Sequence, residues 1–141
     1  MIKYYVGIII ILFFSMSCNN ENKANSPLAI VVKLQAAETL ADFEEAKKYI
    51  DVDKVYSNHP DSISPEEAWK ESVTFLYNLG KDKKFTNVFK YYKYDIRETI
   101  MKDKATVSFK ALSRGDSIKE ILYRLELYKN DWKIIGIDYI K

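Results

Sequence analysis

Three carboxylates lie where the chain alternates apolar and polar residues, and they are the side chains best placed for acid–base chemistry. Such chemistry near neutral pH needs a carboxyl group enclosed by apolar groups, because burial raises its pKa. Glu98 shares its phase of the alternation with Tyr94 and Ile96, so it points either into a core or at the rim of one. Asp95 falls on the opposite, polar phase and is expected to lie in water.

The third candidate, Asp138, belongs to the last alternating segment, and its direction depends on how regular that strand is. In a regular strand Asp138 faces the same way as Ile134. Gly136 could mark a bulge, because glycine inside a strand often does so. A bulge would shift the phase and turn Ile137 and Tyr139 inward in place of the carboxylate. Both alternatives stay open.

Aromatic side chains gather in neighbouring segments and supply the candidate ligand-binding residues. Tyr92 and Tyr94 are two apart and are predicted to share one strand face. Trp69, Phe75 and Tyr77 lie on a predicted helix that faces this strand. Tyrosine combines an apolar ring with a polar tip, which suits a small-molecule pocket. We therefore take Trp69, Tyr77, Tyr92 and Tyr94 as the candidate ligand contacts. The alternative is a core or cavity wall that holds no ligand.

Composition argues against a metal, a cofactor or a nucleic acid as partner. His59 is the only histidine and Cys18 the only cysteine, so no cysteine–histidine zinc set can form. Four glycines leave little material for a phosphate-binding loop, and no cofactor is expected. Basic and acidic residues number 22 and 20 and are interspersed, which is typical of a solvated surface rather than a nucleic-acid-binding stripe.

The first residues have the pattern of a secretion signal. Lys3 supplies a positive charge, and an apolar run follows from Tyr4 to Phe14. These eleven residues would rise about 17 Å as a helix, well short of the ~30 Å hydrocarbon core of a bilayer. The run is therefore too short for a comfortable membrane span and is typical of a cleaved signal peptide.

The sequence Ser15-Met16-Ser17-Cys18 resembles the lipobox of bacterial lipoproteins, although serine stands where leucine is commonest. The resemblance implies that a diacylglycerol is added to the Cys18 thiol and that the chain is cut just before it. Residues 1–17 are then the signal peptide, and residues 18–25 a flexible polar tether between membrane and domain. Asparagine after the cysteine favours the outer membrane of a diderm bacterium. The alternative is an incidental cysteine after a conventional signal peptide.

Residues 26–141 form a single predicted domain, and its first half has the 3.6-residue period of helices. Pro27 is suited to the first position of the first helix. A short second helix is predicted over 43–50. Ser64 and Glu67 form a capping box that begins a third, longer helix.

The second half of the domain changes to a period of two, which predicts strands. Four are expected, over 88–100, 105–111, 121–127 and 132–140. Short turns between consecutive strands indicate an antiparallel meander with one buried face. Helices followed by strands predict an α+β fold, with the N-terminal helices packed on a curved four-stranded sheet.

Two short segments carry a further resemblance. Ala41-Asp42-Phe43 follows the first predicted helix, and Asn130-Asp131-Trp132 begins the last predicted strand. Both resemble the cystatin-like cone of the nuclear-transport-factor-2-like (NTF2-like) superfamily, in particular its small bacterial lipoproteins. The resemblance implies a curved sheet wrapped around a helix, leaving a cone-shaped cavity. Members use this cavity as a ligand pocket, as an isomerase or dehydratase site, or as a protein-docking surface.

These features predict a lipid-anchored protein of the cell envelope that binds a small ligand or a partner protein without catalysis. One alternative is an enzyme of isomerase or dehydratase type, which requires Glu98 or Asp138 to be buried beside the tyrosines. A second alternative is a structural or accessory envelope protein whose cone is filled by its own side chains.

Overall fold

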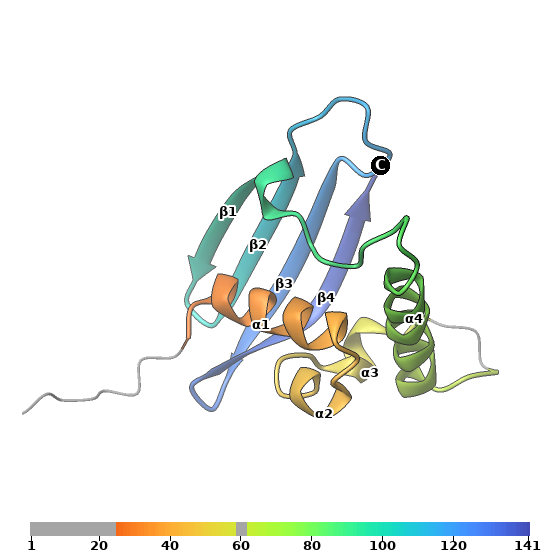
Figure 1. Ribbon diagram of the computed structural model, residues 1–141. Coiled ribbons are helices and arrows are strands. Elements are labelled where there is room, and N and C mark those ends of the chain that lie inside the picture. Colours follow the sequence, from red (N-terminus) through yellow and green to blue (C-terminus); the bar gives the residue numbers. More distant parts are fainter. Residues whose placement is uncertain (1–24, 59–61) are drawn as a thin grey trace, which may run out of the picture.

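The computed structural model describes residues 25–58 and 62–141 (Figure 1). Cys18, the signal segment and His59 lie outside the described residues. The elements in chain order are α1 (Pro27–Thr39), α2 (Phe43–Ala46), α3 (Val52–Val55), α4 (Pro65–Gly80), a 3₁₀ turn η1 (Tyr91–Lys93), β1 (Tyr94–Met101), β2 (Lys104–Ala111), β3 (Glu120–Tyr128) and β4 (Asp131–Ile140). No helix among these elements is long and apolar enough to cross a membrane.

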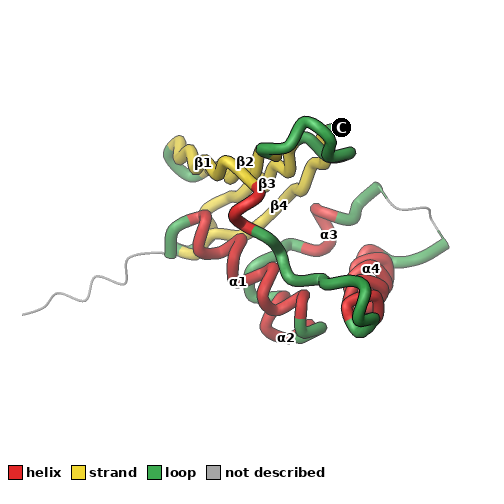
Figure 2. Tube along the Cα trace, turned by 45° about the horizontal axis from the view of Figure 1, so that its top comes forward, coloured by secondary structure: helices red, strands yellow, loops and turns green. Residues whose placement is uncertain are grey.

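The four strands form one antiparallel sheet in the order β1-β2-β3-β4, which confirms the predicted meander and the α+β fold. The helices gather on one face of this sheet, and α4 lies beyond β4 at its edge (Figures 1 and 2). The two tight hairpin turns contain Lys102, Lys129 and Asn130, all with positive φ. The positive φ at these residues lets consecutive strands reverse within a few residues.

The helix starts follow the predicted capping. The Ser26 hydroxyl accepts a hydrogen bond from the Ala29 amide, with Pro27 at the first position of α1. At the start of α4, the Ser64 side chain accepts from the Glu67 amide, and the Glu67 carboxylate accepts in return from the Ser64 amide. Both arrangements satisfy amides that have no partner within the helix.

The core lies between α1 and the concave face of the sheet. α1 buries an apolar stripe of Ile30, Val31 and Leu34, none of them more than 4% exposed. Burial of each such side chain stabilises the fold by roughly 1.5–3 kcal/mol. The sheet residues buried against the helices are Ala105, Val107, Phe109, Ile121, Tyr123, Leu125, Trp132 and Ile134.

The second helix is shorter than predicted. α2 ends at Ala46, and the chain then runs alongside β4 instead of continuing as a helix. The Asp51 amide donates to the Ile134 carbonyl at 2.8 Å, and the Ile134 amide donates to the Tyr49 carbonyl at 2.8 Å. This short parallel pairing gives hydrogen-bond partners to the backbone amide and carbonyl of Ile134 at the β4 edge. Asp51 then caps the start of α3.

The first strand also begins later than predicted, at Tyr94 instead of residue 88. Tyr94 pairs with Ala111, the last residue of β2, so residues before it have no neighbouring strand to pair with. They form η1, and Tyr92 lies there with its side chain 76% exposed. The prediction that Tyr92 and Tyr94 share one strand face is therefore wrong.

β4 contains a bulge opposite β3. Arg124 pairs with Gly136 while the next residue of β3 pairs with Ile134, so Ile135 is the extra residue. Glycine beside it leaves room for the Arg124 side chain, because a Cβ at Gly136 would lie 2.4 Å from a guanidinium nitrogen and would displace it. The bulge shifts the phase of the strand, and Ile137 and Tyr139 face inward. Of the two alternatives for this strand, the bulged one is confirmed.

Candidate functional site

A cavity of about 230 Å³ lies between the helices and the concave face of the sheet. The end of α1, the turn after α3, α4, the connector to β1, and strands β3 and β4 all contribute to it. The lining residues are Gln35, Glu38, Thr39, Tyr56, Ser72, Val73, Leu76, Asn87, Phe89, Ile121, Tyr123, Ile137 and Tyr139. Eight of these thirteen side chains are apolar or aromatic and five are polar, so the wall combines the two kinds of surface that small-molecule sites use.

Glu38 is the carboxylate of this cavity. It lies in the last turn of α1, and its Oε1 accepts a hydrogen bond of 2.8 Å from the Trp69 indole nitrogen. Burial raises the pKa of Glu38, and the bond from Trp69 lowers it by a smaller amount. Trp69 is fully buried and packs edge-on against Phe43, with ring centroids 5.4 Å apart. The indole thus holds one carboxylate oxygen in a fixed place.

Three tyrosine hydroxyls share the cavity with this carboxylate. Burial, with the Glu38 charge as a second cause, raises the pKa of Tyr56 to about 12. Burial likewise raises the pKa values of Tyr123 and Tyr139, and the Glu38 charge contributes to both shifts. Tyr139 lies at the mouth, since 59% of its surface is exposed. At neutral pH all three hydroxyls keep their protons and can donate hydrogen bonds.

Gln35 joins two of the tyrosines of this region. The Tyr91 hydroxyl donates to Gln35 Oε1 at 2.6 Å, and Gln35 Nε2 donates to the Tyr123 hydroxyl at 3.0 Å. Because Tyr123 accepts from Gln35, its own hydroxyl proton remains available to the cavity. Within residues 25–58 and 62–141, the second oxygen of Glu38 and the Tyr139 hydroxyl also make no hydrogen bond.

Aromatic rings close the cavity at the end nearest β1. Phe89 stacks on Tyr94 with ring centroids 5.0 Å apart and meets Phe109 edge-on at 5.2 Å. Phe109 in turn meets Tyr123 edge-on at 5.6 Å. Since Phe89 and Tyr123 both line the cavity, this cluster fixes one of its walls.

The four predicted ligand contacts lie outside the cavity lining, although Trp69 touches it through Glu38. Tyr94 is half-buried in the aromatic cluster behind the wall. Tyr77 is half-buried on α4, and the Lys81 ammonium is 4.3 Å from its ring centroid. Phe75, expected on the facing helix, is 66% exposed and so points away from the sheet.

The carboxylates singled out for acid–base chemistry lie outside the cavity too. Glu98 is on the inner face of β1 but at its rim, where it is exposed and accepts a 2.6 Å hydrogen bond from the Leu28 amide. Asp138 is exposed and pairs with Arg124. Asp95 pairs with Arg97 on the outer face, as its polar phase predicts. The enzyme alternative therefore loses the two carboxylates on which it was based.

Glu38 and Gln35 were missed because a polar residue on a helix is normally taken as solvent-facing. A signal was present in the sequence. Gln35 and Glu38 are one turn apart and flank Leu34 and Ala37, which belong to the apolar stripe of the same helix. Polar residues beside such a stripe lie at the border of the buried face, where they can reach into a cavity.

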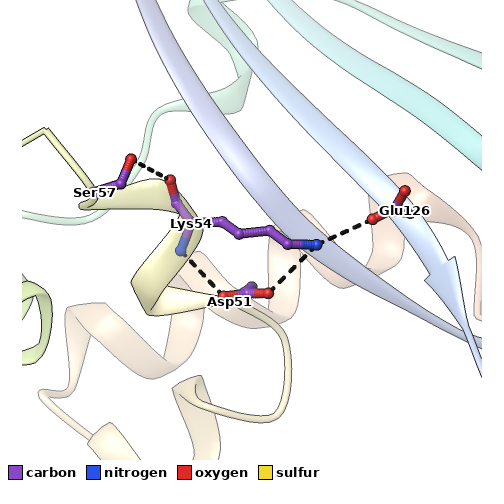
Figure 3. Close-up of polar contacts among 4 residues, drawn as sticks. All are labelled: Asp51, Lys54, Ser57 and Glu126. Carbon is purple, nitrogen blue, oxygen red and sulfur yellow. Dashed lines mark hydrogen bonds and ion pairs between the residues drawn. The ribbon is translucent and has the colours of Figure 1, made fainter.

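A second, larger hollow of about 500 Å³ lies between α3 and the hairpin of β3 and β4. We call it the charged groove. Lys54 spans it, with its ammonium 3.2 Å from Glu126 and 3.7 Å from Asp51 (Figure 3). On the other side, Glu66 pairs with Lys47 at 2.8 Å and with a second lysine.

Neither hollow holds the ligands of a metal site. In the part of the chain that the structure describes, no three histidine, cysteine, aspartate or glutamate side chains come together as a metal would require. The cavity offers one carboxylate, two side-chain amides and neutral hydroxyls among its apolar side chains. Chemically, this set can form hydrogen bonds with a small ligand or exchange a single proton with it.

No protein-family model matches the sequence, and no curated protein matches it. Two solved structures resemble it. The first is an NTF2-like protein from Cytophaga hutchinsonii, 20% identical, with a TM-score of 0.46 and coverage of 80% of this chain and 93% of that one. The second, Kfla4162 protein from Kribbella flavida, is 10% identical, with a TM-score of 0.43 and coverage of 82% and 87%. The likenesses concern the fold alone, and the chemistry of the cavity rests on this chain's own residues.

Proposed function

We propose that the protein is a lipid-anchored envelope protein whose inner cavity binds a small ring-bearing molecule without converting it. The observation that carries the proposal is the position of Glu38. A carboxylate in a mainly apolar cavity, held by the Trp69 indole and surrounded by neutral tyrosine hydroxyls, is a preformed polar anchor. In such a ligand, an apolar body would pack against the apolar side chains of the wall, and one polar group would bond to Glu38 or a tyrosine hydroxyl.

The size and polarity of the cavity define the ligand class. A 150 Å³ apolar cavity in another protein accommodates benzene, so about 230 Å³ suits one ring with a short substituent. The free oxygen of Glu38 accepts a hydrogen bond, whereas the hydroxyls of Tyr123 and Tyr139 donate. A group that both donates and accepts, such as a hydroxyl or a primary amide, therefore fits better than a hydrocarbon.

Fluorescence of Trp69 tests ligand binding, because its indole contacts the proposed anchor. In a Trp132→Phe background, Trp69 is the only tryptophan, since the chain has two. We expect p-cresol and benzamide to shift its emission with saturation, and toluene to do so only weakly. Glu38→Leu should remove the preference for the polar probes over toluene. Equal responses to all three probes, or none, would contradict the proposed site.

The lipid anchor is supported by the lipobox-like sequence at Cys18 and by the polar stretch that separates this cysteine from α1. Two or three acyl chains hold a protein at a membrane stably, whereas one does so only marginally. Metabolic labelling with a clickable fatty acid tests the anchor directly. The wild-type chain should be labelled and Cys18→Ala should not. Equal labelling of both would refute acylation at Cys18.

A second candidate function, proton transfer at carbon, is favoured by the raised pKa of Glu38. An isomerase needs a carboxylate that takes a proton beside a carbonyl group and hydroxyls that stabilise the developing oxyanion. Glu38 and Tyr123 could take these two roles. Incubation with 2-cyclohexenone in deuterium oxide, followed by NMR, tests it: Glu38-dependent deuterium incorporation is expected of an enzyme. Exchange at the same rate with Glu38→Gln would exclude this function.

A further inference from the structure

One end of the domain gathers two hairpin turns and the start of α1. The β1–β2 turn holds Lys102 and Asp103, and the β3–β4 turn holds Lys129 and Asn130. The Leu127 amide donates to the Asp103 carbonyl at 2.7 Å, which ties the two turns together. Figure 1 shows both turns at the end of the sheet where α1 begins.

Glu98 fixes the start of α1 close to these turns. Its carboxylate accepts a hydrogen bond from the Leu28 amide, in the first turn of the helix. Ile100 follows on the same face of β1, two residues nearer to the turn. At about 3.3 Å per residue, β1 ends at Met101 about 10 Å beyond the contact with α1, and the turn follows directly.

This end exposes apolar side chains together with lysines. Ile100, Met101 and Tyr128 are 52%, 72% and 61% exposed. The Lys129 ammonium lies 5.2 Å from the centroid of the Tyr128 ring, and Lys102 and Lys104 lie at the neighbouring turn. A membrane surface favours this combination, because tyrosine and aliphatic groups enter the headgroup region while lysine ammonium groups stay with the phosphates.

The tether length selects this end over other exposed apolar surfaces. Eight Cα steps separate Cys18 from Ser26, which is at most about 29 Å of extended chain. Another exposed apolar side chain, Phe75, belongs to α4, and α4 lies beyond the far end of α1 (Figure 1). The 13 residues of α1 alone span about 20 Å. A lipid on Cys18 therefore holds the hairpin turns near the bilayer far more readily than it could hold α4 there.

We propose that the two hairpin turns are a membrane-resting surface that docks on a phospholipid bilayer. Ile100, Met101 and Tyr128 enter the headgroup region, and the three neighbouring lysines contact lipid phosphates. The inference rests on the proposed anchor at Cys18. It sets the orientation of the domain, with the sheet standing on its end and α4 held away from the lipid.

Fluorescent labels at two matched positions test this orientation. Cys18 is the only cysteine of the chain, and acylation blocks its thiol, so Met101→Cys and Phe75→Cys can each be labelled alone. The two native side chains are similarly exposed, at 72% and 66%. The full precursor is produced in a bacterium, and the acylated product is reconstituted into phosphatidylethanolamine vesicles that contain phosphatidylglycerol. Headgroup nitroxide lipids then quench labels near the surface.

Quenching of the Met101→Cys label is expected to exceed that of the Phe75→Cys label several-fold. Replacing Ile100 and Tyr128 by serine, with the label at position 101, should reduce the quenching while the protein still floats with the vesicles. Equal quenching at both positions, or stronger quenching at position 75, would overturn the orientation but leave the anchor intact. A protein that does not float with vesicles and takes up label at Cys18 would overturn the anchor, and the orientation with it.

Discussion

The inner cavity and the charged groove both border β4, yet their ionisable groups behave in opposite ways. In the cavity, burial raises the pKa values of Glu38 and the tyrosines and so favours their neutral forms. In the groove, hydrogen bonds from Lys47 and Lys70 lower the pKa of Glu66 to about 2, which favours its charged form. A glutamate of the cavity thus tends to keep its proton, whereas a glutamate of the groove is ionised and its charge is balanced by lysines.

The difference shows that volume is a poor guide to a binding site. The groove is about twice as large as the cavity, at about 500 Å³ against about 230 Å³. Its lysines and carboxylates already satisfy one another, and exposed ion pairs of this kind contribute little. The smaller cavity has polar groups that still lack partners between partly buried walls, where a hydrogen bond to a ligand is worth more than in open water.

Loss of the indole of Trp69 should have the largest effect. Trp69→Ala is expected to reduce the free energy of unfolding by about 3–5 kcal/mol, because it empties a fully buried site and leaves Glu38 without its donor. Urea unfolding followed by circular dichroism measures this loss. Phe75→Ala on the same helix is the control and should change stability by less than about 0.5 kcal/mol. Similar losses for both variants would contradict the structure of the cavity wall.

Gln35→Leu should have the next largest effect, a loss of about 1–3 kcal/mol, because it leaves the Tyr91 and Tyr123 hydroxyls without their partner. Replacing both tyrosines by phenylalanine in the same chain should recover much of the loss, since no buried polar group is then left unpaired. A triple variant that is less stable than Gln35→Leu would argue against this hydrogen-bonded bridge.

Glu38→Gln should raise the free energy of unfolding, and the size of the gain should depend on pH. We expect this change to be smaller in magnitude than the loss caused by Gln35→Leu. The folded chain holds the Glu38 proton more tightly than the unfolded chain, whose carboxyl titrates near 4.5. The stability of the wild type therefore falls as the pH rises from 4.5 through the raised folded pKa. The gain from glutamine should be largest at neutral pH and vanish below 4.5. Urea unfolding across this range measures it, and a pH-independent gain would contradict burial of the carboxyl.

The smallest effect is expected in the charged groove. Lys54→Met removes the cation shared by Asp51 and Glu126 but exposes no buried group, since the ammonium is already in water. Its urea midpoint should stay within the scatter of repeated measurements, and molar sodium chloride should erase any difference. A loss comparable to that of Gln35→Leu would show that the groove is more than a solvated surface.

Much of the fold was predictable from sequence because local rules govern it. Capping residues and proline begin α1 and α4 where the pattern predicts, and the period of two locates all four strands. The start of β1 at Tyr94 was not predictable from local sequence. It depends on the end of β2, because Tyr94 pairs with Ala111, the last residue of β2. Local alternation contains no information about whether a neighbouring strand is present.

The cavity was less predictable because its polar groups come from distant parts of the chain. Glu38 becomes a cavity residue only when Trp69 of α4 and Tyr123 of β3 are brought beside it. The aromatic pattern drew attention to Trp69, Tyr77, Tyr92 and Tyr94, and none of these four residues lines the cavity. It could not distinguish rings that face the cavity from those that, like Tyr92, lie in solvent.

The extra residue Ile135 makes the chemistry of the cavity depend on where β4 places its bulge. If Ile135 paired with Arg124 in a regular strand, every later residue of β4 would slip by one position relative to β3. Asp138 would then take the place of Tyr139 at the cavity mouth, and a second acid would stand near Glu38. Loss of the codon for Ile135 would instead leave the later pairs as they are, so a shortened β4 would keep the present cavity wall and lose only the bulge.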